Sequence, residues 1–274
     1  MEDGVKDKET DGVDILSLLE RTERAVVAAG EIIKEAWERP RSVQRKGRID
    51  LVTETDLAVE AALKESLAAF VPEALFMAEE SCAVETRAPD SGYVWVIDPL
   101  DGTTNFVHAL PFVAISTALC HNGAPILSVV YNPALNELFR AGRGYGAFLN
   151  GRKIRVSTAE RLEAGVVATG FPYTIDRDVD ELLLYLRRIL PLCQGIRRYG
   201  VASLDLAYTA ASRLDAFYEI GLKPWDTAGG WLLVEEAEGQ VSQFDLESPY
   251  RLGARTILAS NGRIHREMSM MLTA

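Results

Sequence analysis

The sequence has 274 residues, of which 48% are hydrophobic and 25% charged, so it can bury a large core as one big domain or as two closely packed halves. Its formal net charge of −11 argues against direct, nonspecific binding to nucleic acid, which depends on a basic footprint. No apolar run approaches the roughly 20 residues that span a bilayer, and the charged N-terminus does not resemble a secretory signal, so we expect a cytoplasmic protein with no membrane partner.

The first part of the chain predicts two helices and a short strand. Residues 1–11 are expected to form a disordered leader, and an amphipathic helix should follow over 13–37. The apolar stripe of this helix is expected to contain Leu16, Leu19, Val26, Ile33 and Trp37. A second helix is predicted over 55–70, ending before Pro72, with a strand over 75–78 behind it.

The middle of the chain predicts antiparallel hairpins, and the rest predicts alternating strands and helices. Strands over 113–119 and 126–131 flank Asn122-Gly123, and Asn150-Gly151 joins the next two short strands. Beyond about residue 157, strands are expected near Val166, over 216–220 and near Ile257, and helices over 179–190, 203–213 and 227–238 and at the C-terminus. This alternation favours layered α/β packing. We interpret residues 12–274 as a single domain of two halves, about 12–156 and 157–274, that share one central cleft.

A sharp turn after the strand over 93–97 brings oxygen ligands together. Asp98 lies where we expect this strand to stop, and Gly102 permits the turn that follows. Asp98, the Leu100 carbonyl and Asp101 would offer oxygens to one point, which suits Mg²⁺ better than Zn²⁺. Taken alone, such a turn is structural more often than functional.

Three further acidic groups also lie where a strand leads into the next segment. Thr53 and Asp56 would fit a helix N-cap and third position, and Asp226 would fit an N-cap. Glu79 and Glu80 leave an apolar strand, at the edge where open α/β sheets place ligands. Each group has a structural explanation, but capping alone explains all four poorly. Together they favour a site with several Mg²⁺ ions.

Other catalytic arrangements have little support in the sequence. The three histidines, His108, His121 and His265, have no spaced partners, and no G-x-S-x-G motif is present. Gly142–Gly146 lacks the Lys-Ser/Thr ending of a phosphate loop and is better interpreted as a glycine-rich hairpin.

Four segments of the chain resemble the inositol monophosphatases, which belong to a lithium-sensitive, Mg²⁺-dependent phosphatase superfamily with fructose-1,6-bisphosphatase. These segments are residues 50–56, 79–81, 95–108 and 221–230, with Glu235-Glu-Ala237 behind the last, and the third is the most specific. The resemblance extends over nearly the whole chain. It implies an α/β (α+β) fold, a layered αβαβα sandwich.

The resemblance also implies a role for individual residues. Two or three Mg²⁺ ions would be held by Glu79, Asp98, the Leu100 carbonyl, Asp101 and Asp226. The catalytic residues would be Asp56 and Thr103, which orient and deprotonate a metal-bound water, and Glu79, which would help to hold a third, weaker ion. The substrate would be bound by Asp101, Gly102, Thr103, Ala202, Glu219 and Asp226, with the phosphate on the amides of Gly102 and Thr103.

The activity implied is Mg²⁺-dependent hydrolysis of inositol 1-phosphate, or of a related small phosphorylated polyol, by a homodimer. Alternatives on the same scaffold are a fructose-1,6-bisphosphatase and a nucleotide 3′-phosphatase. A further alternative is protein binding in transcription antitermination, because the chain also resembles the bacterial SuhB branch through residues 222–225.

Three positions depart from the family pattern. Ala78 stands where glycine is common, and Lys46 is one residue nearer to Asp50 than the family lysine, so Lys46 is left out of the expected site. Val201 replaces a hydroxyl residue in the loop that faces the substrate, which leaves the sugar preference open.

Overall fold

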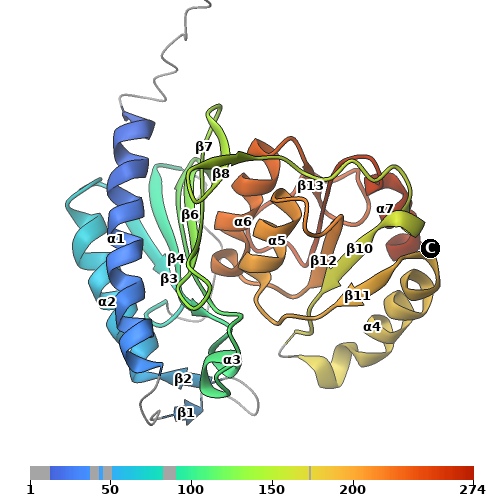
Figure 1. Cartoon of the computed structure of the whole chain (residues 1–274), viewed down its shortest axis with the longest axis horizontal. Helices are drawn as coiled ribbons and strands as arrows, with labels where there is room; N and C mark the ends of the chain where they lie inside the picture. Colours follow the sequence, from blue (N-terminus) through green and yellow to red (C-terminus); the bar gives the residue numbers. More distant parts are fainter. Residues whose placement is uncertain (1–12, 38–42, 46–50, 83–90, 173) are drawn as a thin grey trace, which may run out of the picture.

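Five layers of helices and sheets make up the fold (Figure 1). The computed structural model describes residues 13–37, 43–45, 51–82, 91–172 and 174–274. The predicted leader, Lys46 and Asp50 lie outside these residues. In order, the layers are the helices α1 (Ile15–Ala36) and α2 (Glu54–Ala68), a seven-stranded sheet, the helices α5 (Ala202–Ala210) and α6 (Pro224–Glu236), a five-stranded sheet, and the helices α4 (Ile175–Ile189) and α7 (His265–Thr273). The predicted αβαβα sandwich is confirmed.

The larger sheet is built from strands in sequence order, and the predicted hairpins are present. Its strands are β3 (Leu75–Ala78), β4 (Tyr93–Asp101), β5 (Ala114–His121), β6 (Ala124–Asn132), β7 (Glu137–Gly142), β8 (Gly146–Leu149) and β9 (Arg152–Ile154). β3 and β4 are parallel, and every later pair is antiparallel. Both residues of each Asn-Gly turn have positive φ, from 47° to 79°, as tight hairpins between twisted strands require.

The smaller sheet has the order β11-β10-β12-β14-β13. Its strands are β10 (Val166–Thr169), β11 (Gly195–Arg197), β12 (Ala216–Ile220), β13 (Gln240–Ser242) and β14 (Thr256–Ser260). β9 ends at Ile154 and β10 begins at Val166, on either side of the division that we place near residue 157. The two halves stay a proposal, which these strand positions support.

Three hydrophobic cores lie between the layers. Along β4, Val94 and Val96 face the central helices, whereas Trp95 and Ile97 face α1 and α2, as the two-residue period of a strand requires. The third core packs α4 and α7 on the outer face of the smaller sheet, with Leu182, Tyr218 and Met268 buried. Among the described residues, no helix is long and apolar enough to cross a membrane.

The structure corrects several predicted boundaries. Leu16 was expected in the buried stripe of α1 but is 48% exposed, and Ile15 and Leu18 take its place beside Leu19. α4 begins four residues earlier than predicted. α6 begins three residues earlier, because Pro224 is tolerated in the first helical turn. β11 and β13 were not predicted, since each is a three-residue strand at an edge of its sheet.

Candidate active site

The acidic turn is part of strand β4 and does not follow its end. The strand was expected to stop at Ile97, but its pairing with β5 continues to Asp98 and, after an irregularity, to Asp101. Pro99 lies within this irregularity and so does not interrupt a regular ladder. Gly102 follows with a φ of +91°, and the short helix α3 (Thr103–Val107) begins directly after it. The predicted need for glycine at the turn is confirmed.

Asp98 is the most deeply buried carboxylate of this turn. Its Oδ1 accepts a hydrogen bond of 3.0 Å from the Leu100 N–H, and its side chain is nearly fully enclosed. Burial raises its pKa well above the usual range, and the charges of Glu79, Asp101 and Asp226 raise it further. Four carboxylates from three distant segments of the chain therefore concentrate negative charge at one place.

Asp101 and Asp226 are each held through one carboxylate oxygen. The Asp101 Oδ2 accepts hydrogen bonds from the Ser203 N–H and hydroxyl, at 2.8 and 2.6 Å. Burial raises the pKa of Asp101 to about 6, against the lowering effect of Ser203. The Asp226 Oδ2 accepts from the Lys223 N–H at 2.7 Å. Asp226 therefore occupies the third position of α6, which corrects its assignment as an N-cap.

Asp56 links the start of helix α2 to the acidic turn. Its Oδ2 accepts from the Thr53 N–H and hydroxyl, at 2.9 and 2.5 Å, and Thr53 caps α2, so the predicted N-cap and third position are confirmed. Its Oδ1 accepts from the Thr103 hydroxyl at 3.0 Å. Burial raises the pKa of Asp56, and its bonds to both threonines lower it. The Leu100 carbonyl lies 3.1 Å from the same Thr103 hydroxyl.

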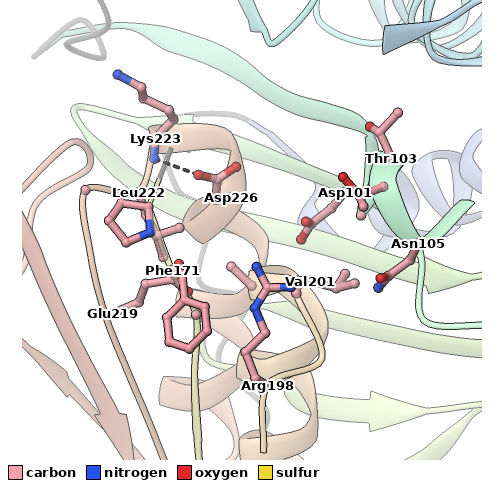
Figure 2. A pocket seen from close by; sticks show the side chains of 17 residues that line it. Asp101, Thr103, Asn105, Phe171, Arg198, Val201, Glu219, Leu222, Lys223 and Asp226 are labelled. Atoms are coloured by element: carbon pink, nitrogen blue, oxygen red, sulfur yellow. Dashed lines mark hydrogen bonds between the residues drawn. The ribbon is translucent and has the colours of Figure 1, made fainter. Parts of the chain in front are cut away.

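A cavity of about 270 Å³ opens beside these carboxylates (Figure 2). All six residues expected to bind substrate line it, namely Asp101, Gly102, Thr103, Ala202, Glu219 and Asp226. In Figure 2, the carboxylates of Asp101 and Asp226 face each other across the opening, and Arg198 points into it. The other expected residues, Asp56, Glu79, Asp98 and Leu100, do not line the cavity. Thr103, which lines the cavity, is hydrogen-bonded to Asp56 and to the Leu100 carbonyl. The charges of Glu79, Asp101 and Asp226 act on Asp98.

The oxygen-rich composition of the site suits a hard cation. Within the described part of the chain, no three acidic, histidine or cysteine side chains already form a cluster that could hold a metal ion. The carboxylates are nevertheless near enough for their charges to raise the pKa of Asp98 and Asp226 beyond the effect of burial. One oxygen of Asp98 and one of Asp226 accept local backbone hydrogen bonds, and one oxygen of Asp101 accepts from Ser203 on α5. A divalent cation would relieve this repulsion, and Mg²⁺ prefers such ligands. The residues present therefore fit the expected metal.

Sequence reasoning missed three charged residues: Arg198 and Lys223 line the cavity, and Asp205 lies outside its lining. The Arg198 guanidinium lies 5.3 Å from the centre of the Phe171 ring, and its charge lowers the pKa of Asp101 and Glu219. Arg198 directly follows β11. Because β11 was not predicted, the position of Arg198 at the edge of the sheet could not be predicted either. Asp205 is fully buried in α5, and in the described part of the chain neither carboxylate oxygen has a hydrogen-bond partner. A lone charge in an apolar helix was the available signal.

The histidines that the structure buries or stacks lie away from the cavity. His265 is buried between the hydroxyls of Ser242 and Ser260, each 2.8 Å from a ring nitrogen, and burial lowers its pKa to about 4. His121 stacks on Tyr93 with ring centres 4.4 Å apart. Neither ring lines the cavity, and Gly142–Gly146 forms the hairpin between β7 and β8.

Gly170 leaves the space that the Glu219 carboxylate occupies. Glu219 is buried on β12, and burial raises its pKa to about 8. A Cβ atom at position 170 would lie 2.1 Å from the Glu219 Oε2, well inside a van der Waals contact. Any larger residue at position 170 must therefore displace the Glu219 carboxylate from the cavity.

We expect Gly170→Ala to raise KM and to lower kcat/KM about tenfold, the effect of losing one hydrogen bond to a charged group. Steady-state kinetics on the best substrate measures this change. Gly195→Ala is the matched control, because a Cβ there would meet only the flexible end of Arg197, at 3.0 Å. An unchanged KM in Gly170→Ala would show that the position of Glu219 does not matter for substrate binding.

Comparisons with known proteins agree with this arrangement. Residues 15–273 match the sequence model of the inositol monophosphatase family. The inositol-1-monophosphatase of Synechocystis sp. is 42% identical over 95% of this chain and 90% of its own. The Nus factor SuhB of Escherichia coli (strain K12) is 43% identical over 89% of this chain and 91% of its own.

Solved structures show the same architecture. The extragenic suppressor protein SuhB from Bartonella henselae superposes with a TM-score of 0.86 at 37% identity, covering 94% of this chain and 98% of that one. The inositol monophosphatase from Anabaena (Nostoc) sp. superposes with a TM-score of 0.85 at 36% identity, covering 95% and 96%.

Proposed function

The chain belongs to the inositol monophosphatase family, and we propose that it is a Mg²⁺-dependent phosphomonoesterase acting on inositol 1-phosphate or a related small polyol phosphate. Membership of the family supports a phosphatase. The observation that carries the proposal is the cavity in which Asp101, Gly102 and Thr103 of one segment meet Glu219 and Asp226 of another. The wall formed by Asp101, Gly102 and Thr103 can hold a phosphate with its metal, and the opposite wall can hold the hydroxyls of the substrate.

We assign the metal ligands to the clustered carboxylates and one carbonyl. Two or three Mg²⁺ ions would be held by Glu79, Asp98, the Leu100 carbonyl, Asp101 and Asp226. Bound Mg²⁺ would lower the pKa of a water and neutralise the charge on the leaving alcohol oxygen. Support comes from the burial of Asp98 among three other carboxylates, which leaves negative charge in excess. The number of ions is part of the proposal.

Asp56 and Thr103 are the proposed partners of the attacking water. The Asp56 carboxylate accepts the Thr103 hydrogen bond at 3.0 Å, and its other oxygen is held by Thr53, so its orientation is fixed before substrate arrives. A carboxylate whose pKa is raised by burial is a better proton acceptor than a free one. The Gly102 and Thr103 amides would receive the phosphate.

The alcohol side of the cavity is built by Ala202, Glu219 and Val201. Glu219 would accept hydrogen bonds from substrate hydroxyls, beside the main chain of Ala202. Val201 is fully buried and lines the same cavity with methyl groups instead of a hydroxyl. Its side chain would approach a Cβ at Gly102 to within 2.8 Å, so it packs against the proposed phosphate turn.

A phosphate-release screen tests the proposal. The purified protein is incubated with inositol 1-phosphate, other polyol phosphates, fructose 1,6-bisphosphate and nucleotide 3′-phosphates, each with and without Mg²⁺. We expect Mg²⁺-dependent release, fastest with a small polyol monophosphate. A preference for the bisphosphate or for a nucleotide would favour the corresponding alternative. Absence of release from every substrate would refute a phosphatase.

A second candidate is a binding function, because relatives at 43% identity carry the name Nus factor SuhB. The net charge of −11 favours protein contacts over direct contacts with nucleic acid. Affinity purification from the native cell would recover transcription proteins if this function holds, and an Asp98→Asn variant would still recover them. We also propose a homodimer, which light scattering of the purified protein would test.

A further inference from the structure

One face of helix α2 presents three polar side chains in line. Asp56, Glu60 and Lys64 are spaced four residues apart, so they lie above one another along the helix. Asp56 and Glu60 are buried, at 1% and 4% exposure, although α2 packs on the outer face of the larger sheet. Asp56 contacts the acidic turn through Thr103, whereas Glu60 and Lys64 lie one and two turns further along the helix.

Glu60 is bonded to the segment that follows strand β3. Its Oε2 accepts a 2.8 Å hydrogen bond from the N–H of Glu80, twenty residues further along the chain. Its Oε1 accepts from the Lys64 Nζ at 2.9 Å, which offsets the cost of burying the Glu60 charge. Lys64 also donates a hydrogen bond to the Ser81 hydroxyl. Two side chains of α2 therefore hold residues 80 and 81.

Glu79 is fixed from both sides by these contacts. Its own N–H donates to the Ile97 carbonyl on β4 at 3.1 Å, directly before Asp98, and the next N–H in the chain donates to Glu60. Burial raises the pKa of Asp98 and of Asp226, and the Glu79 charge raises both further, so Glu79 lies near these two carboxylates. The peptide between residues 79 and 80 is thus held between β4 and α2.

We propose that Glu60 is a positioning residue that sets the metal affinity of the site by holding the Glu79–Glu80 peptide, with Lys64 as its counter-ion. This inference rests on the proposed metal site, and it assigns a function to a pair that touches neither substrate nor metal. Through Asp56 and Glu60, the same helix fixes both the base and the Glu79 ligand. Movement of α2 relative to β4 would therefore disturb both.

The test measures Mn²⁺ binding by titration calorimetry without substrate. We expect Glu60→Ala to weaken Mn²⁺ binding about 10- to 100-fold, as happens when a group that orients a metal ligand is removed. Glu60→Gln should bind within a few-fold of wild type, because its amide oxygen can still accept the Glu80 N–H. In turnover, Glu60→Ala should need more Mg²⁺ for half-maximal rate but approach the wild-type kcat at saturation.

Glu23→Ala is the matched control, because Glu23 also pairs with a cation, Arg140 at 2.5 Å, but lies on α1. Each variant is first checked by circular dichroism, and Lys64→Met replaces Glu60→Ala if the latter does not fold. Lys64→Met should also weaken Mn²⁺ binding, because it removes the counter-ion and the bond to Ser81.

Wild-type Mn²⁺ affinity in folded Glu60→Ala or Lys64→Met would overturn the inference, as would equal losses in Glu60→Gln and Glu60→Ala. A wild-type protein that binds no Mn²⁺ would also overturn it. A wild-type protein that binds Mn²⁺ but hydrolyses no phosphate ester would refute the proposed phosphatase and leave the inference standing if the Glu60 variants differ as expected.

Discussion

Asp98→Asn is expected to lose Mg²⁺-stimulated phosphate release by about 10³-fold or more, because a catalytic metal contributes several kcal/mol to transition-state stabilisation. Asp98 is a proposed metal ligand that is buried among the other three carboxylates, so its loss affects the whole site. Initial rates across a Mg²⁺ titration measure the effect. Excess Mg²⁺ should restore little of the rate, since an uncharged amide oxygen is a poor substitute for a carboxylate ligand.

The same variant should fold normally. Asparagine has nearly the same shape, and its oxygen can still accept the Leu100 N–H that bonds to Asp98 at 3.0 Å. Without metal, the substitution also removes one of four mutually repelling charges. We therefore expect thermal unfolding of the metal-free variant at or above the wild-type temperature. Normal turnover in Asp98→Asn would end the assignment of this turn as the metal site.

Asp56→Asn should lower kcat by about 10²- to 10⁴-fold, the usual contribution of a positioned general base. The affinity for Mn²⁺ should stay near that of wild type, because Asp56 is not among the proposed ligands. Asparagine can still accept the Thr53 N–H, now bonded at 2.9 Å, so much of the cap of α2 remains. Single-turnover kinetics and Mn²⁺ calorimetry on the same preparation separate these two effects.

Thr53→Ala is the control for the capping function of Asp56. It removes the hydroxyl that donates a 2.5 Å hydrogen bond to Asp56. This loss should cost about 1 kcal/mol of stability, as loss of an N-cap does. Its kcat should fall far less than that of Asp56→Asn. If both variants lost stability and rate in parallel, the carboxylate would be serving as a helix cap and not as a base.

The sequence was most informative where one local rule decides the structure. The Asn-Gly turns have positive φ as the hairpin rule requires, and Thr53 and Asp56 form the predicted helix start. The expected site residues were named through the resemblance, and the structure brings those from distant segments to one cavity or directly behind it. Their roles stay predictions until the variants are measured.

Features that depend on neighbours in space were not predictable from local pattern. β4 continues past Pro99 because Asp101 pairs with Ala114 on β5. The local sequence of residues 93–97 gives no information about this pairing partner. Asp226 looked like an N-cap, but the helix extends back to Pro224 because the Asp226 carboxylate bonds the Lys223 N–H. Asp205 is a lone charge in an apolar helix, but its complete burial follows only from the packing around α5.

The bonds between Asp101 and Ser203 have a consequence for the order in which the molecule assembles. These residues are 102 positions apart, and Ser116 and Trp225, which bring α6 onto the larger sheet, are 109 apart. During synthesis, Glu79, Asp98 and Asp101 leave the ribosome more than a hundred residues before Asp226, and closing so long a loop is slow. The cavity is therefore completed late in folding, after most of the chain has been made.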